Sequence, residues 1–197
     1  MKIMGKRFAA GAVAAVGVAL VALCQTAQKT HKITTISTQK MADSLHAVIA
    51  ADRDAYARLV VQRLAFDTTR LDVSEEWKER DCLPTHAQLL REAGTSIQKR
   101  GAEFSYALRS LWPINPSHGP QTEVEQTGLE FVARNPGQRY STEETLGGRS
   151  YFTAIYADVA SLSSCVDCHN RHPRSPRKDF KAGEVMGAIV VRVPLEF

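Results

Sequence analysis

Apolar residues in the first half of the chain recur at three- and four-residue spacing, the period of an amphipathic helix. Between Thr38 and Phe66 this pattern predicts one long helix, and the repeating positions are Leu45, Val48, Ile49, Tyr56, Leu59, Val60 and Leu64. A second helix is predicted for PTHAQLLREAG, which would begin at Pro84-Thr85 and stop at Gly94. A third is predicted for residues 121–133, which are followed by NPG.

In the second half of the chain the pattern changes to alternation. Phe104, Tyr106, Leu108 and Trp112 alternate mostly with polar or small residues until PINPSHGP interrupts the run. Alternation of this kind predicts a half-buried strand. Two further strands are predicted for YFTAIYADVA, which follows a turn at Gly147-Gly148, and for GEVMGAIVVRVPL near the C-terminus. Helices that precede and interrupt strands, with the strands pairing antiparallel, predict an α+β fold.

The composition allows one globular domain, or one domain with an appendage. The chain has 197 residues and a hydrophobic fraction of 44%, which argues against disorder. The net charge is +4, but Lys2, Lys6 and Arg7 lie in residues 1–24, which contain no acidic residue. Without these three cations the remainder carries about +1, since 4 − 3 = 1. Global charge therefore gives no reason to expect a nucleic-acid partner.

The N-terminus has the pattern of an export signal. MKIMGKR is followed by an uncharged run of small apolar residues from Phe8 to Cys24. A basic segment before such a run predicts a signal peptide or membrane anchor over residues 1–26. Leu23 precedes Cys24 where cleavage would need a small residue, so we favour an uncleaved anchor in the cytoplasmic membrane. The remainder is then expected on the extracytoplasmic, or periplasmic, side.

The segment SSCVDCHNRHP, residues 163–173, contains two of the four cysteines of the chain. A thioredoxin-like redox motif would need a preceding βαβ unit, which the pattern does not predict. A zinc site would need four ligands, but Cys165, Cys168, His169 and His172 lie within eight residues and no second cysteine pair follows. Covalent haem attachment explains the spacing best, because residues three apart share one face of a helical turn.

Haem attachment also assigns a role to each of the three residues. Both thiols, Cys165 and Cys168, would reach the two vinyl groups on one edge of a porphyrin. His169 would then lie under the ring as the proximal iron ligand. The expected cofactor is one covalently bound haem c with its iron.

At three segments the chain resembles a known family. NPSHGP at residues 115–120 is similar to the family's Asn-Pro-x-Asn-x-Pro turn, with His118 in place of the second asparagine. CVDCHN is similar to its haem-binding segment, and GEVMGAIVVRVPLEF to its closing strand. The family consists of single-haem c-type cytochrome domains with a PAS-like fold, once classed as a domain of unknown function. They occur alone or as extracytoplasmic sensor modules of membrane receptors and kinases.

The resemblance covers roughly residues 40–197, and together with the N-terminal pattern and the long helix described above it predicts a domain division. A signal peptide or anchor would span residues 1–26, an N-terminal helix residues 27–66, and a PAS-like c-type haem domain residues 67–197. The implied fold is an antiparallel sheet flanked by helices, preceded by a long N-terminal helix. The haem would lie against the sheet.

The sixth iron ligand stays open at this point. In the family a cysteine from the N-terminal helical part can take this position, which here would be Cys82. His86, four residues later, is the alternative, followed by another side chain such as Met41, His118 or Met186, or by water. The choice matters because a thiolate lowers the reduction potential, whereas Met/His ligation raises it.

Basic residues follow the haem motif, and among them we expect Arg171 and Arg174 to bind the haem propionates. A solvated loop or a docking surface for an acidic redox partner is the alternative interpretation of this cluster.

We expect a haem redox protein rather than an enzyme, one that senses redox state or a small ligand, or transfers single electrons. Its partner would be a redox protein or a membrane signalling protein, reached at the membrane through the N-terminus. The alternative is a haem enzyme of the peroxidase or small-molecule reductase type. It would need an open distal iron site and an acid–base residue, for which His86 and His118 are the candidates. A haemless structural module is a third interpretation.

Overall fold

The structure is a computed structural model that describes residues 35–196. The signal peptide or anchor predicted for residues 1–26 lies outside the described residues. Within residues 35–196, no helix is both long enough and apolar enough to cross a membrane.

The long N-terminal helix is present where the apolar spacing predicts it. Helix α2 (Thr38–Tyr56) continues without a break into η1 (Ala57–Asp67), a stretch of π-helix. The side chain of Ser37 caps the start by accepting a hydrogen bond from the backbone N–H of Lys40 at 3.2 Å. The wider π-helical turn is visible where the N–H of Thr68 donates to the carbonyl of Arg63, five residues back, at 3.2 Å.

Four antiparallel strands form the central sheet. They are β3 (Ser105–Arg109), β4 (Tyr140–Leu146), β5 (Arg149–Val159) and β6 (Val185–Pro194), in the order β3-β6-β5-β4. The three strands predicted from the sequence are β3, β5 and β6. The fourth, β4, escaped prediction because two of its four inward positions, Thr142 and Glu144, are polar.

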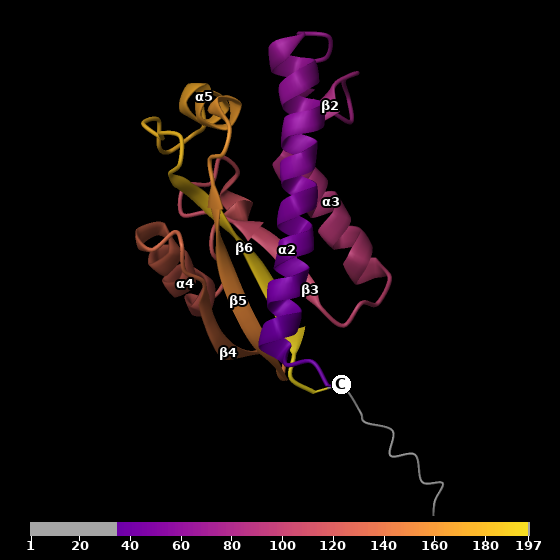
Figure 1. Ribbon diagram of the computed structural model, residues 1–197, viewed down its shortest axis with the longest axis vertical. Helices are drawn as coiled ribbons and strands as arrows, with labels where there is room; N and C mark the ends of the chain where they lie inside the picture. The colour runs from indigo at the N-terminus through magenta and orange to yellow at the C-terminus, as the bar shows by residue number, and fades with distance from the viewer. Residues whose placement is uncertain (1–34, 197) are drawn as a thin grey trace, which may run out of the picture. The chain divides into compact units, whose positions relative to one another are not determined.

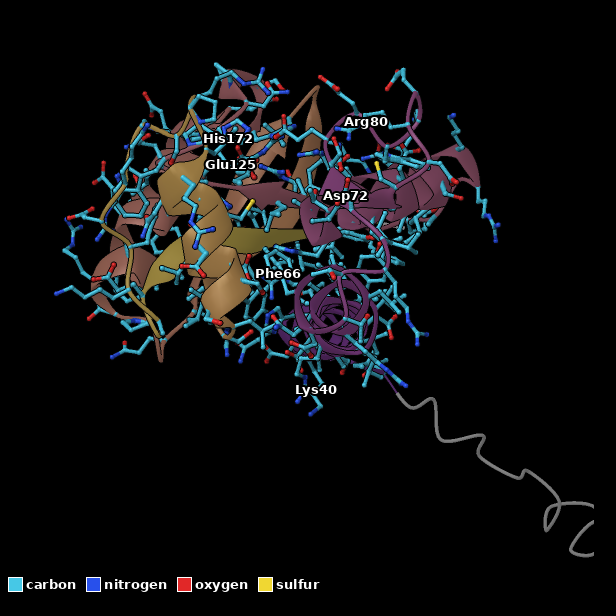
Figure 2. All side chains as sticks on the ribbon, turned by 90° about the horizontal axis from the view of Figure 1, so that it is seen from above. Lys40, Phe66, Asp72, Arg80, Glu125 and His172 are labelled. Carbon is cyan, nitrogen blue, oxygen red and sulfur yellow. The ribbon has the colours of Figure 1, made fainter. Side chains whose placement is uncertain are left out.

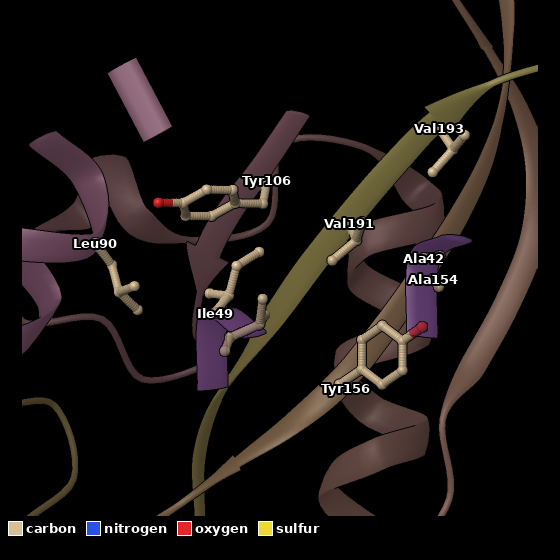
Figure 3. Close-up of a cluster of buried hydrophobic side chains, with 9 residues drawn as sticks. Ala42, Ile49, Leu90, Tyr106, Ala154, Tyr156, Val191 and Val193 are labelled. Carbon is tan, nitrogen blue, oxygen red and sulfur yellow. The ribbon is translucent and has the colours of Figure 1, made fainter. Parts of the chain in front are cut away.

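Helices cover both faces of the sheet, which confirms the α+β, PAS-like arrangement (Figure 1). Helices α2 and α3 (His86–Lys99) pack on one face, and α4 (Glu123–Arg134) packs on the other. Alternation along β6 serves both layers, since Val191 contacts the α2 side and Val190 the α4 side. The larger buried cluster, on the α2 side, is shown in Figure 3 and consists of Ala42, Ile49, Leu90, Tyr106, Ala154, Tyr156, Ile189, Val191 and Val193.

The predicted end of the second helix at Gly94 is wrong. Helix α3 continues to Lys99, and Gly94 is buried in its middle. A β-carbon at this position would lie 3.3 Å from the carbonyl oxygen of Tyr106, so the glycine allows α3 to approach β3 closely. Tertiary packing therefore explains a residue that local pattern assigns to a helix end.

One end of the sheet gathers several short elements. The antiparallel register brings the end of β3, the end of β5 and the start of β6 to this end, since Arg109 pairs with Ala188 and Asp158 with Gly187. Helix α5 (Ser163–Arg171) connects β5 to β6 here. The pair β1 (Val73–Ser74) and β2 (Leu83–Pro84) lies at the same end, as does α5, in Figure 1.

Candidate functional site

A cavity of about 420 Å³ opens at this end of the sheet. Its volume lies within the ~300–1,000 Å³ typical of ligand and cofactor sites. Its wall includes residues of η1, of the start of α3, of the ends of β3 and β5, of α5 and of the start of β6. Figure 2 looks onto this end of the molecule, where Phe66 of η1 and His172, directly after α5, are two labelled residues of the wall.

Helix α5 carries the cysteine–histidine motif into this wall. Cys165, Cys168 and His169 all line the cavity. Because positions three and four apart share a helix face, one short helix presents both sulfur atoms and the imidazole to the same space. The spacing predicted this arrangement, and the fold provides the space.

The two thiols differ in exposure. Cys165 is buried, whereas Cys168 is exposed. Desolvation raises the pKa of both thiols. Neither forms a disulfide. A redox-active CxxC pair instead needs a thiol with a lowered pKa, and usually sits in a βαβ unit. Here the strands on either side of α5, β5 and β6, are antiparallel.

No three His, Cys, Asp or Glu side chains between residues 35 and 196 converge in the way that a metal ion held by protein ligands alone would require.

The loop after α5 is clamped back onto the helix. The side chain of Asn170 donates to the carbonyl of Phe180 at 2.9 Å and accepts from the N–H of Phe180 at 3.0 Å. The Phe180 ring then packs in a buried cluster with Cys165 and Met186. The guanidinium of Arg177 lies 4.4 Å from the centroid of this ring. The loop thereby fixes the orientation of α5.

The imidazole of His169 has an uncommitted nitrogen. Its Nδ1 atom is buried and has no hydrogen-bond partner among the described residues. The ring packs edge-on against Phe180, with 5.9 Å between centroids. Burial, followed by the charge of His172, lowers the pKa of His169, so the ring is favoured in its neutral form. A neutral imidazole is the form that binds a metal.

Three further histidines line the same cavity: His86, His118 and His172. Burial, followed by the positive charge of Arg53, lowers the pKa of His86 to about 3. Burial and the charges of Arg91 and Arg109 lower that of His118 to about 4. Both rings are therefore neutral near pH 7.

A buried ion pair forms part of the cavity wall. The guanidinium of Arg53, on α2, lies 2.9 Å from the carboxylate of Asp158 at the end of β5. Burial raises the pKa of Asp158, and the charge of Arg53 opposes that effect. The pair fastens the N-terminal helix to the strand that leads into α5.

Most of the site residues predicted from the sequence meet at the cavity. Cys165, Cys168, His169, Arg174 and His86 line it. Two others, Cys82 and Arg171, are not part of the lining formed by residues 35–196. Arg171 is 80% exposed and pairs with Asp167. Arg174 forms an ion pair with Glu75.

Several lining residues were not predicted as part of the site. The cationic ones are Arg53, Arg80, Arg91 and Arg109, and the aromatic one nearest the motif in the core is Trp112. Their positions in the sequence are far from the motif, so no local spacing identifies them. Only Trp112 had a signal, as an aromatic residue of a predicted strand.

Comparison with known proteins agrees with the resemblance drawn from the three motifs. The model of the Tll0287-like family matches residues 21–194. Among solved structures, the crystal structure of the cyanobacterial haem protein Tll0287 is similar, with a TM-score of 0.43 and 18% identity over 57% of this chain and 73% of that chain. None of the curated proteins matches. Because the family model covers most of its length, the chain belongs to the Tll0287-like family.

Proposed function

We propose that this chain is a c-type haem protein in which α5 holds one haem covalently in the cavity. One observation carries the proposal: Cys165, Cys168 and His169 line a single cavity in a chain whose family is named after a haem protein. The wall also offers the apolar surface that a porphyrin needs, from Val61, Leu108, Trp112, Ile114 and Met186.

The residues present fit this cofactor. Each thiol S–H would add across one vinyl C=C bond, a step that needs no oxidant. His169, whose neutral ring is held by Phe180, would bind the iron as proximal ligand. A bound haem supplies one-electron exchange at its iron. Arg174 and Arg91 on the wall provide cationic partners for the two propionates.

The role that we propose is redox or ligand sensing, or single-electron transfer, on the extracytoplasmic side of the cytoplasmic membrane. The basic N-terminus and the apolar run after it support this location. The partner would be a redox protein or a membrane signalling protein. A redox titration followed by absorbance would test this role, since an iron that cannot be cycled reversibly between its ferric and ferrous states would contradict it.

The cofactor is tested by the mass of the mature protein, made in a host equipped for cytochrome c maturation. We expect the mass of the polypeptide plus one haem, which persists under denaturing conditions. The control is the double variant C165A/C168A, which should have the mass of the polypeptide alone. Wild-type protein without added mass would contradict the proposal, and two added haems would contradict its stoichiometry.

A further inference from the structure

We propose that His86 is the second axial ligand of the iron, so that the haem is held between two imidazoles, those of His169 and His86. The inference rests on the proposed haem function and deepens it. Both side chains line the same cavity but come from different elements, α5 and the start of α3.

Hydrogen bonds to the other two histidines of the cavity, His118 and His172, occupy the lone pair of one ring nitrogen in each. Nδ1 of His118 lies 2.8 Å from the guanidinium of Arg91. Arginine only donates, so this nitrogen must accept, and the proton of a neutral His118 then sits on Nε2. His172 is committed in the same way, because its Nδ1 accepts from the backbone N–H of Arg174 at 3.2 Å. A nitrogen that carries a proton has no lone pair for iron.

His86 has no such commitment. No hydrogen bond to either of its ring nitrogens occurs within the described part of the chain. Its neutral ring therefore keeps a lone pair available on whichever nitrogen faces the iron.

The sulfur ligands considered for the sixth position lie elsewhere. Cys82 precedes β2 and is not part of the described cavity lining. Met41 packs against the core between α2 and the sheet. Met186 does line the cavity, but its side chain is committed to the buried cluster of Cys165 and Phe180.

The backbone around His86 is fixed in advance. Thr85 and Gln88 form a capping box, with the N–H of Gln88 donating to Oγ1 of Thr85 at 3.2 Å and the N–H of Thr85 donating to Oε1 of Gln88 at 2.9 Å. The hydroxyl of Tyr56, at the end of α2, donates to the carbonyl of Pro84 at 2.9 Å. These bonds tie the first turn of α3 to the N-terminal helix, so His86 needs little reorganisation to bind.

The experiment compares three variants of the full-length holoprotein. Wild type should be six-coordinate and low spin in both oxidation states, with the electron paramagnetic resonance signature of two imidazoles. The H86A variant should keep its covalent haem by mass, become high spin, bind carbon monoxide when reduced, and regain a low-spin spectrum when imidazole is added. The matched control H118A, a histidine of the same cavity, should stay low spin, and so should C82A.

Each contrary outcome has its own meaning. The H86A protein could keep the mass of polypeptide plus haem and still remain low spin. That result would overturn the ligand assignment while leaving the haem proposal intact. Wild type that binds carbon monoxide would indicate an open distal site, and a thiolate signature in wild type would point to Cys82. Either result also overturns the assignment, and neither depends on whether H86A folds. Absence of haem from wild type would instead refute the proposed function.

Discussion

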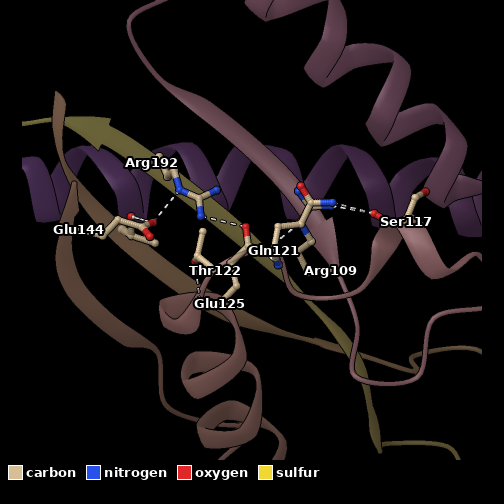
Figure 4. A network of polar contacts seen from close by, with 8 residues as sticks. Arg109, Ser117, Gln121, Thr122, Glu125, Glu144 and Arg192 are labelled. Atoms are coloured by element: carbon tan, nitrogen blue, oxygen red, sulfur yellow. Dashed lines mark hydrogen bonds and ion pairs between the residues drawn. The ribbon is translucent and has the colours of Figure 1, made fainter. Parts of the chain in front are cut away.

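Two regions of the molecule bury polar side chains: the network under α4 and the wall of the cavity. They differ in how completely those side chains are hydrogen-bonded or ion-paired. Under α4, Arg192 contacts Glu125 at 2.9 Å and Glu144 at 2.7 Å, and Glu144 also accepts from Thr153 (Figure 4). Around the cavity, by contrast, Nδ1 of His169 has no partner among the described residues. Burial of charge alone therefore does not mark a functional site. The better indicator here is a neutral side chain with a buried atom that has no hydrogen-bond partner.

The largest expected effect comes from breaking the paired side. The Arg192→Ala substitution leaves Glu144 and Glu125 buried without this partner, which should lower the free energy of unfolding by about 3–5 kcal/mol. Urea denaturation measures the loss, and Arg192→Lys is the control that should recover part of it. A loss under about 1 kcal/mol would mean that Arg109 and solvent compensate, and that the network is less closed than its contacts imply.

A smaller effect is expected from pH on the cavity side. The pKa of His118 is about 4 in the folded protein against 6.5 ordinarily, so the unfolded chain binds the extra proton first as pH falls. The free energy of unfolding should therefore decrease as pH falls through the window between these values. In the His118→Gln variant this decrease should be shallower, while stability above the window stays close to wild type. Parallel curves for the two proteins would argue against the shift.

The smallest effect is expected at the rim of the cavity. Arg174 and Glu75 form an ion pair whose side chains are 63% and 38% exposed. Exposed pairs contribute up to about 1 kcal/mol, so Arg174→Ala should change the free energy of unfolding by no more than that. Glu75→Ala is the matched control and should give a similar value. If Arg174→Ala lowered the free energy of unfolding as much as Arg192→Ala does, the exposed pair at the rim would not differ in energy from the buried network.

Sequence predicted those parts of the molecule that depend on local periodicity. The long helix, three of the four strands of the central sheet and the motif on α5 all follow from the pattern within a single segment. The strand β4 was missed because its inward residues include the polar Thr142 and Glu144, and the partners of Glu144 come from other segments. Gly94 was misinterpreted for the same reason, since its role depends on Tyr106.

The candidate site divides along the same line. The thiols and His169 are adjacent in sequence and were identified directly. The sequence could not decide whether Cys82 or His86 is the second iron ligand. The two residues are only four positions apart, and no local pattern indicates which side chain faces α5. Arg53 belongs to the cavity wall through its ion pair with Asp158, which lies more than a hundred positions away in the sequence. Such a pair forms only once the chain is folded.

The burial of Cys165 has a consequence for biogenesis. Its residue surface is only 7% exposed, and the clamped loop with Phe180 closes over the same cluster. In the folded domain a porphyrin edge could reach that sulfur only by entering the cavity that Cys165 lines. Attachment of the haem that we propose is therefore favoured before residues 160–186 have packed, so this chain is expected to receive its cofactor during folding rather than after it.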